Sequence, residues 1–330
     1  MAKKADKVDK VLNNLYAGGA IVNLGENPRY VEKEPTNRPS MDYVTDGGIP
    51  KGRLILVAGA PSAGKSSWTI QMSNIIGNKI LYIDTEATLT TDYIVSLGGD
   101  PSKFDHVIPE STEQLCNIIR QQAGNYDVIV TDSINNSASS EQIQKTAEEK
   151  TMANRANVLS AQLPIIISLC NQYNTTLFIL SQIRDNMNKA NMYSPDTIIP
   201  GGKSLHHNSS MTLEFRPSTK KKSKDSDEME AYDTISGRMV RIHCSKNKVG
   251  KPFRTVEVEF ALGKGYTVEA DIASAAIRLG IIKKKGSWLY YNDATICQGA
   301  DNLSLTLEDN PELMEELTAK IEELTAKTDS

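Results

Sequence analysis

Cysteine is scarce in this 330-residue chain, and long apolar runs are missing. The four cysteines, Cys116, Cys170, Cys244 and Cys297, lie far apart, without the spacing of a zinc site or a disulfide framework. We expect reduced, buried thiols. Apolar runs such as 163–170 are much shorter than the roughly 20 residues that cross a bilayer, and no apolar segment follows the charged start. A cytoplasmic protein without a membrane partner is therefore predicted.

An excess of positive charge is also missing. The chain has 37 Lys and Arg residues against 41 Asp and Glu residues, a formal net charge of −4. Dedicated nucleic-acid binders are usually basic, so any contact with DNA must come from local patches. The 39% hydrophobic and 24% charged residues are typical of a globular protein with one large core and smaller appendages.

Short apolar runs alternate with helical periodicity through the middle of the chain. The periodicity is clearest from Trp68 to Ile76, where apolar residues form one stripe that ends at Gly77. This alternation predicts a mostly parallel sheet with helices on both faces. The apolar runs lie at 54–58, 80–83, 128–130 and 177–180.

Later runs have short connections and predict strands that extend the sheet in the antiparallel direction. These runs lie at 211–215, 239–244 and 256–260. The charge run 220–230 cannot be buried and is predicted to be a surface hairpin. From residue 268, a helical face, a strand candidate at 288–291 and a last helix from Pro311 indicate a small α+β appendage.

A glycine-rich segment joins the first apolar run to the amphipathic helix. It reads Gly-Ala-Pro-Ser-Ala-Gly-Lys-Ser and matches the phosphate-binding pattern G-x-x-x-x-G-K-[ST]. Backbone N–H groups would surround a triphosphate, Lys65 would neutralise its β and γ phosphates, and Ser66 would bind Mg²⁺. A chance Gly-Lys-Ser turn is the alternative, and the flanking strand and helix argue against it. The predicted nucleotide-binding residues here are Gly59, Ala60, Pro61, Ser62, Ala63, Gly64, Lys65, Ser66 and Ser67.

Two further apolar runs end in carboxylates. The segment 127–133 resembles a Walker B strand, and its Asp132 would reach the same Mg²⁺ as Ser66, through water. Glu86 follows the run at 80–83 and is the candidate general base for the attacking water. A plain surface carboxylate is the alternative for Glu86.

The order of these motifs resembles bacterial RecA and its phage relatives over nearly all of residues 40–312. The matching segments are 40–42, 47–53, 83–86, 128–133, 181–184, 201–202, 246–248, 252–253, 263–265, 286–288 and 309–312. The resemblance implies an α/β RecA-like P-loop ATPase core with a mostly parallel sheet. It also implies ATP and Mg²⁺ as cofactors.

The family resemblance assigns roles to several residues outside the phosphate loop. Gln182, at a strand end, would contact the γ phosphate and report it to the following segment. Lys246 and Lys248 alternate along an extended segment, so they point the same way and would reach the ATP of a neighbouring subunit. Tyr93 would stack on adenine. The alternatives are an ordinary strand-end amide for Gln182, a solvated strand end for the two lysines, and a tyrosine of the core for Tyr93.

The resemblance also implies two DNA-binding loops, near 144–153 and at about 184–200. Backbone contacts there would give sequence-tolerant binding, with Met152 and Met192-Tyr193 as candidates for insertion into stretched DNA. The predicted DNA-binding residues are Met152, Arg155, Arg184, Asn186, Lys189, Met192, Tyr193, Gly201 and Gly202.

Several positions depart from the family pattern. His206 and His207 replace a lysine and a phenylalanine, and Thr90 replaces an aspartate that contacts adenine. Pro164 and Leu262 replace a basic residue and a tyrosine. A lysine-rich insertion at 220–224 and the lack of a long acidic tail favour a phage or divergent member.

Three parts of the chain are predicted. Residues 1–39 would form an N-terminal helix and linker for subunit packing, 40–267 the ATPase core with its DNA-binding loops, and 268–330 a small C-terminal domain. The predicted function is a DNA-dependent ATPase that forms helical homo-filaments on single-stranded DNA and exchanges strands with homologous duplex. Single-strand-binding or mediator proteins are further expected partners. A ring helicase of the same fold, or a recombination-accessory ATPase without strand exchange, remain alternatives.

Overall fold

The computed structural model describes residues 30–139, 154–185, 197–198, 202–222 and 235–328. The described residues from Lys33 onward belong to one compact unit. Within the described residues, no helix combines the length and apolar character that a membrane span requires. Cys116, Cys170 and Cys244 are buried and all four cysteines are free, as expected.

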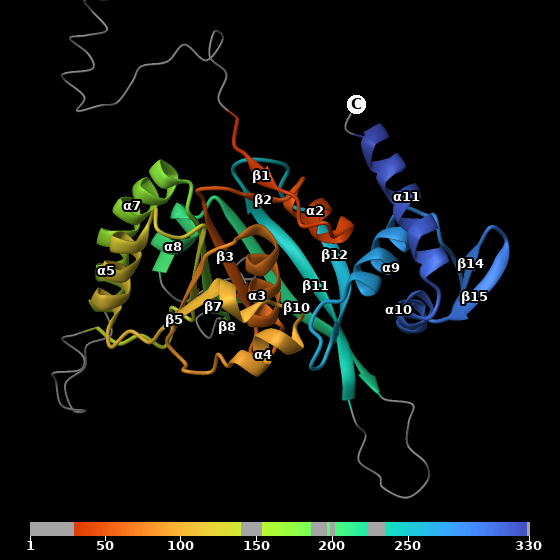
Figure 1. Cartoon of the computed structure of the whole chain (residues 1–330), viewed down its shortest axis with the longest axis horizontal. Helices are drawn as coiled ribbons and strands as arrows, with labels where there is room; N and C mark the ends of the chain where they lie inside the picture. The colour runs from red at the N-terminus through yellow and green to blue at the C-terminus, as the bar shows by residue number, and fades with distance from the viewer. Residues whose placement is uncertain (1–29, 140–153, 186–196, 199–201, 223–234, 329–330) are drawn as a thin grey trace, which may run out of the picture. The chain divides into compact units, whose positions relative to one another are not determined.

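An eight-stranded sheet in the order β12-β11-β10-β3-β7-β6-β4-β5 forms the centre of the fold (Figure 1). The strands from β10 to β5 run parallel to one another, β11 pairs antiparallel with β10, and β12 pairs antiparallel with β11. This confirms the predicted mostly parallel sheet with an antiparallel extension. The strand bounds are Leu54–Gly59 (β3), Ile80–Asp84 (β4), Phe104–Val107 (β5), Val128–Asp132 (β6), Thr176–Gln182 (β7), Met211–Lys222 (β10), Ile235–Asn247 (β11) and Thr255–Ala261 (β12).

Alternate residues of each central strand enter different cores. Ile55 and Val57 of β3 pack on one face, and Leu54 and Leu56 pack on the other. Because both faces are covered, all residues of β3 are buried, which explains the continuous apolar run. The first face is covered by α2 (Pro39–Thr45), α3 (Lys65–Ile76) and α4 (Thr91–Ser96), and the second by α5 (Thr112–Gln122), α7 (Asn154–Tyr173) and α8 (Gly202–Asn208).

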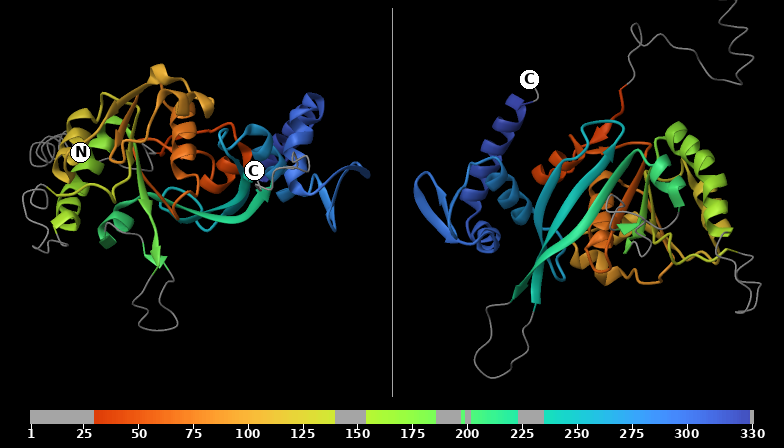
Figure 2. Two further views of the ribbon diagram at one scale, coloured as in Figure 1. Left: turned by 90° about the horizontal axis from the view of Figure 1, so that it is seen from below. Right: turned by 180° about the vertical axis from the view of Figure 1, so that it is seen from behind.

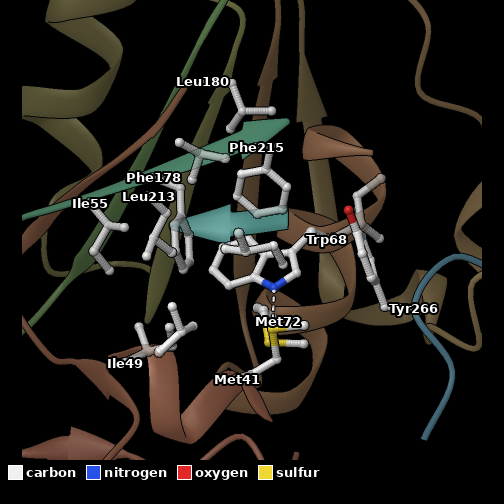
Figure 3. Close-up of a cluster of buried hydrophobic side chains, with 14 of the residues drawn as sticks. Met41, Ile49, Ile55, Trp68, Met72, Phe178, Leu180, Leu213, Phe215 and Tyr266 are labelled. Atoms are coloured by element: carbon white, nitrogen blue, oxygen red, sulfur yellow. Dashed lines mark hydrogen bonds between the residues drawn. The ribbon is translucent and has the colours of Figure 1, made fainter. Parts of the chain in front are cut away.

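Trp68 fixes α3 against the sheet in the larger core (Figure 3). Its ring makes edge contacts with Phe178 and Phe215, at centroid distances of 6.0 and 5.5 Å. Its indole N–H donates to Met41 Sδ at 3.1 Å, so its polar atom has a partner inside the core. The helix that follows the glycine-rich loop is therefore held rigidly on the sheet.

Strands β10 and β11 are longer than the sequence predicted. Their pairing continues through Lys220↔Arg238 to Lys222↔Ile235, so residues 220–222 of the charge run are paired strand, as in the arm of a hairpin. The charges are tolerated because β10 runs on beyond β3, whose pairing with it ends at Phe215↔Gly59 (Figure 2). Residues 223–234 lie outside the described residues.

The C-terminal region forms a small antiparallel sheet with three helices and its own apolar cluster. The predicted helical face at Ile272 and Ala276 is buried, and the last helix begins at Pro311 as predicted. The bounds are Val268–Arg278 (α9), Lys283–Lys285 (β13), Trp288–Tyr291 (β14), Ala294–Gln298 (β15), Ala300–Glu308 (α10) and Pro311–Thr328 (α11). The short elements elsewhere are Lys33–Glu34 (β1), Ile49–Pro50 (β2), Pro101–Lys103 (η1), Arg184–Asp185 (β8) and Thr197–Ile198 (β9).

Asp271 joins α9 to the start of α2 and should make stability depend on pH. Its Oδ2 accepts from Ser40 N at 2.8 Å, and its Oδ1 is buried without a partner among the described residues. Burial raises the pKa of Asp271 to about 7, although the backbone hydrogen bond from Ser40 and the charge of Arg38 lower it and Asp42 raises it. Because the folded chain holds this proton more tightly than the unfolded chain, the contribution of Asp271 to the free energy of unfolding falls as pH rises from 3.8 to about 7.

Replacing Asp271 with asparagine should remove this loss. The amide oxygen can still accept from Ser40 N, and no charge is buried at high pH. Relative to the wild type, the variant should gain on the order of 2–4 kcal/mol between pH 5 and pH 8, at about 1.4 kcal/mol per pKa unit. Urea unfolding at both pH values measures this gain, and parallel pH profiles of the two proteins would contradict it.

Candidate active site

The glycine-rich loop lies at the carboxyl end of β3, where α/β sheets bind ligands. Gly59 ends the strand, and α3 begins at Lys65. Gly64 has φ +78°, and a Cβ there would lie 2.6 Å from Tyr266 Oη, so this position requires glycine. The loop backbone and the N-terminus of a 12-residue helix thus meet at one point, as a phosphate site requires.

Lys65 folds back over its own loop. Its Nζ donates to Gly59 O at 3.0 Å and to Ala60 O at 2.8 Å, and the residue is 7% exposed. Burial lowers the pKa of Lys65, while the charges of Asp132 and Glu86 act in the opposite direction. The ammonium group therefore sits inside the loop that would hold the phosphates.

Ser66 and Asp132 meet, as the sequence predicted for a shared Mg²⁺ site. Ser66 Oγ donates to Asp132 Oδ2 at 2.5 Å across the carboxyl ends of β3 and β6. A second donor, Tyr82 Oη, reaches the same oxygen at 2.7 Å. Burial raises the pKa of Asp132, and the hydrogen bonds from Ser66 and Tyr82 lower it. The sequence did not indicate a role for Tyr82, because 80–83 has only the pattern of an apolar strand.

A hydroxyl and one carboxylate fit Mg²⁺, which prefers oxygen ligands and is usually held by one or two carboxylates together with substrate phosphates. The described part of the chain contains no group of three or more His, Cys, Asp or Glu side chains that could hold a metal ion unaided. The residues present therefore suit a magnesium–nucleotide complex better than a metal held by protein ligands alone.

Glu86 lies at the centre of a small polar cluster. Its Oε1 accepts from Ser133 Oγ at 2.9 Å and Asn136 Nδ2 at 2.8 Å, and Gln182 Nε2 lies at 3.5 Å. The neighbouring Asp84 is fully buried and accepts the backbone N–H groups of Glu86, Thr88 and Leu89, so it shapes the loop that carries Glu86. Glu86 and Gln182 are thus brought together, and Ser133 and Asn136 are partners that the sequence did not reveal.

Gln182 also stands next to the phosphate loop. It is paired in register with Gly59, and Ile183 N donates to Gly59 O at 3.1 Å. Arg184 follows directly in β8. The chain therefore passes from the phosphate site into the predicted second DNA-binding segment within two residues.

Lys246 and Lys248 point the same way, as their spacing predicted. Lys246 Nζ donates to His206 O at 2.5 Å and His207 O at 3.0 Å, and Lys248 Nζ donates to His207 O at 3.0 Å. These carbonyls end α8, where a helix carries partial negative charge. Within the described residues, neither ammonium group bonds to the phosphate loop of its own subunit. His206 and His207 thus contribute backbone atoms to a lysine contact that the sequence did not indicate.

Tyr93 and Thr90 lie beside α3. Tyr93 Oη is 2.7 Å from Ser67 Oγ, and its ring packs partly buried against the larger core. Thr90 Oγ1 accepts from Tyr93 N and caps α4. Adenine stacking by Tyr93 stays a prediction.

The residues predicted to bind DNA are only partly described. Arg155 lies in α7, Arg184 in β8, and Gly202 begins α8. The remaining candidates, Met152, Asn186, Lys189, Met192, Tyr193 and Gly201, lie outside the described residues.

A glycine-rich loop between β3 and α3, with a carboxylate from β6 bonded to its serine, defines a P-loop protein of the α/β class. The family model for the RecA N-terminal domain matches residues 3–267, and that for the RecA C-terminal domain matches residues 270–326. This chain belongs to the RecA family.

Its similarity to individual relatives extends over most of its length. Protein RecA of Malacoplasma penetrans is 33% identical over 276 residues, covering 82% of this chain and 81% of the relative. Protein RecA of Helicobacter hepaticus is 30% identical over 321 residues, covering 95% of this chain and 90% of the relative. The crystal structure of the RadB recombinase matches 68% of this chain and 94% of its own, with a TM-score of 0.50 and 16% identity, which supports the fold.

The chain is thus a RecA-like DNA recombinase. Membership of the family implies a DNA-dependent ATPase that binds DNA and associates with itself.

Proposed function

We propose that this chain, with ATP and Mg²⁺, forms a helical filament on single-stranded DNA, pairs that strand with homologous duplex and exchanges strands. The observation that carries the proposal is that Gln182 lies in register with Gly59 of the phosphate loop and is followed within two residues by Arg184. Arg184 begins the predicted second DNA-binding segment. Ordering of that segment by a phosphate contact at Gln182 would couple the nucleotide to DNA.

Hydrolysis would use the residues around the loop in separate roles. Gly59 to Ser67 would surround the triphosphate, and Lys65 would exchange its carbonyl partners for phosphate oxygens. Ser66 and Asp132 would hold Mg²⁺, which when bound neutralises phosphate charge. Glu86, oriented by Ser133 and Asn136, would orient the attacking water and accept its proton.

A neighbouring subunit would complete the site. Lys248 is exposed and Lys246 half-buried, and both are directed at α8. They would reach the ATP bound by the next copy of the chain. Head-to-tail contacts that do not close into a ring produce open helices, and placing ATP at the contact would make assembly depend on nucleotide. Residues 1–39 would add to this packing, around a core at 40–267 and a C-terminal domain at 268–330.

DNA would be bound by the inner face of the filament. The predicted contacts come from Arg155, Arg184 and the two loops, and they would follow the backbone with little sequence preference. Since the net charge is −4, affinity would depend on assembly and fall with salt.

A strand-exchange assay with the full chain tests the proposal directly. With ATP, Mg²⁺ and a labelled oligonucleotide, homologous duplex should give exchanged product, and heterologous duplex should give none. Electron microscopy of the same mixture should show open helical filaments. Closed rings would favour a helicase, and filaments without exchanged product would favour an accessory ATPase.

A further inference from the structure

Tyr82 is a buried residue of β4 whose hydroxyl contacts Asp132, a predicted Mg²⁺ ligand. The residue is 2% exposed, and its ring belongs to the larger core beneath α3. The hydroxyl donates to Asp132 Oδ2 at 2.7 Å. A tyrosine in this position is therefore apolar over its body and polar only where it touches the site.

The register of the sheet explains this contact. Tyr82 pairs with Val130, and Asp84 pairs with Asp132 on the same two parallel strands. Alternate residues point to one face, so Tyr82, Val130 and Asp132 share a face, with Asp132 diagonal to Tyr82. Diagonal neighbours lie within reach of long aromatic side chains. The contact follows from two strands of the rigid centre of the sheet and needs no loop.

The two donors to Asp132 differ in their freedom to move. Ser66 Oγ is the other predicted Mg²⁺ ligand. When Ser66 Oγ binds the cation, its lone pair must face Mg²⁺, so its hydroxyl has to reorient. The Tyr82 hydroxyl stays beside Asp132, because its ring is packed in the core. Both donors bind Oδ2, and Oδ1 receives no hydrogen bond from the described residues. One carboxylate oxygen is thus held by Tyr82 while the other stays available.

We propose that Tyr82 is a positioning residue that holds the Asp132 carboxylate in the orientation needed to bind Mg²⁺ beside the nucleotide. This inference rests on the proposed function, because it assumes that Ser66 and Asp132 bind Mg²⁺. Hydrogen bonds from outside the ligand set orient metal ligands, and their loss typically costs about 10–100-fold in metal affinity. A tyrosine that only satisfies its own hydroxyl in the core would affect folding stability and leave Mg²⁺ binding unchanged.

Tyr82→Phe separates these roles, because it removes the hydroxyl and keeps the packed ring. Binding of a fluorescent ATP analogue by the full chain is titrated with Mg²⁺, and melting temperatures are measured with and without Mg²⁺. The half-saturating Mg²⁺ concentration should rise by about tenfold or more in the variant. Nucleotide binding in EDTA and at saturating Mg²⁺ should match the wild type.

Tyr291→Phe is the matched control. Tyr291 is buried in the C-terminal region, and its hydroxyl likewise donates to a carboxylate, Glu316 Oε1, at 2.5 Å. This variant should titrate with Mg²⁺ as the wild type does. If Tyr82→Phe and the wild type give equal Mg²⁺ titrations, with or without a lower melting temperature, the role of Tyr82 is overturned and the proposed function is not affected. If the wild type itself shows no Mg²⁺-dependent nucleotide binding, both the inference and the proposed function are overturned.

Discussion

Replacing Lys65 with alanine is expected to abolish ATP turnover, with a loss of at least about 10²–10³-fold. Lys65 is the cation inside the phosphate loop, 7% exposed, and its Nζ donates to the carbonyls of Gly59 and Ala60. Lys65 belongs to neither apolar core of the sheet, so the fold should survive. The variant would lack the ammonium group that stabilises the charge developing on the transferred phosphate. No other described lysine bonds to this loop.

Phosphate release in the presence of single-stranded DNA measures this effect. Lys320→Ala is a suitable control, because it removes the same charge from the exposed last helix, where Lys320 pairs with Glu316. The control should keep wild-type turnover. Turnover by Lys65→Ala within a few fold of the wild type would show that this loop does not hold the hydrolysed nucleotide.

The phosphate loop and the contact between Ser66 and Asp132 could be predicted from sequence, because each depends on a short motif that follows a strand. A strand, a glycine-rich turn and a helix fix where Lys65 and Ser66 lie, and parallel strand ends bring Asp132 to the same edge. The alternation of apolar runs was equally informative about the sheet, since strands covered on both faces must be continuously apolar.

The partners of the site residues could not be predicted in this way. Tyr82 reaches Asp132 only through the register between β4 and β6, and a sequence does not state register. Asn136 reaches Glu86 across 50 residues, and Lys246 reaches the end of α8 across 40. These contacts depend on tertiary packing. The length of β10 was underestimated because charged residues in a strand are tolerated where the strand leaves the core.

Replacing Lys248 with alanine is expected to leave ATP binding by single subunits intact and to suppress DNA-stimulated hydrolysis by about 10²–10³-fold. Lys248 Nζ bonds to His207 O at the end of α8 and to no residue of its own phosphate loop among those described. Its loss therefore leaves the local site complete. In a filament, the neighbouring ATP would lose a cation that acts across the contact.

Mixing two inactive variants tests whether the lysine acts between subunits. Lys65→Ala keeps Lys248, and Lys248→Ala keeps an intact phosphate loop. In a random equimolar filament, about a quarter of the contacts would therefore place an intact phosphate loop against an intact Lys248. Hydrolysis should thus reappear on mixing and only with single-stranded DNA present. Lys251→Ala, which removes an exposed lysine whose backbone N–H bonds to Asp46, should keep stimulated turnover. Normal stimulated turnover by Lys248→Ala would rule out a role for this lysine across the contact, whereas an inactive mixture would place it within its own subunit.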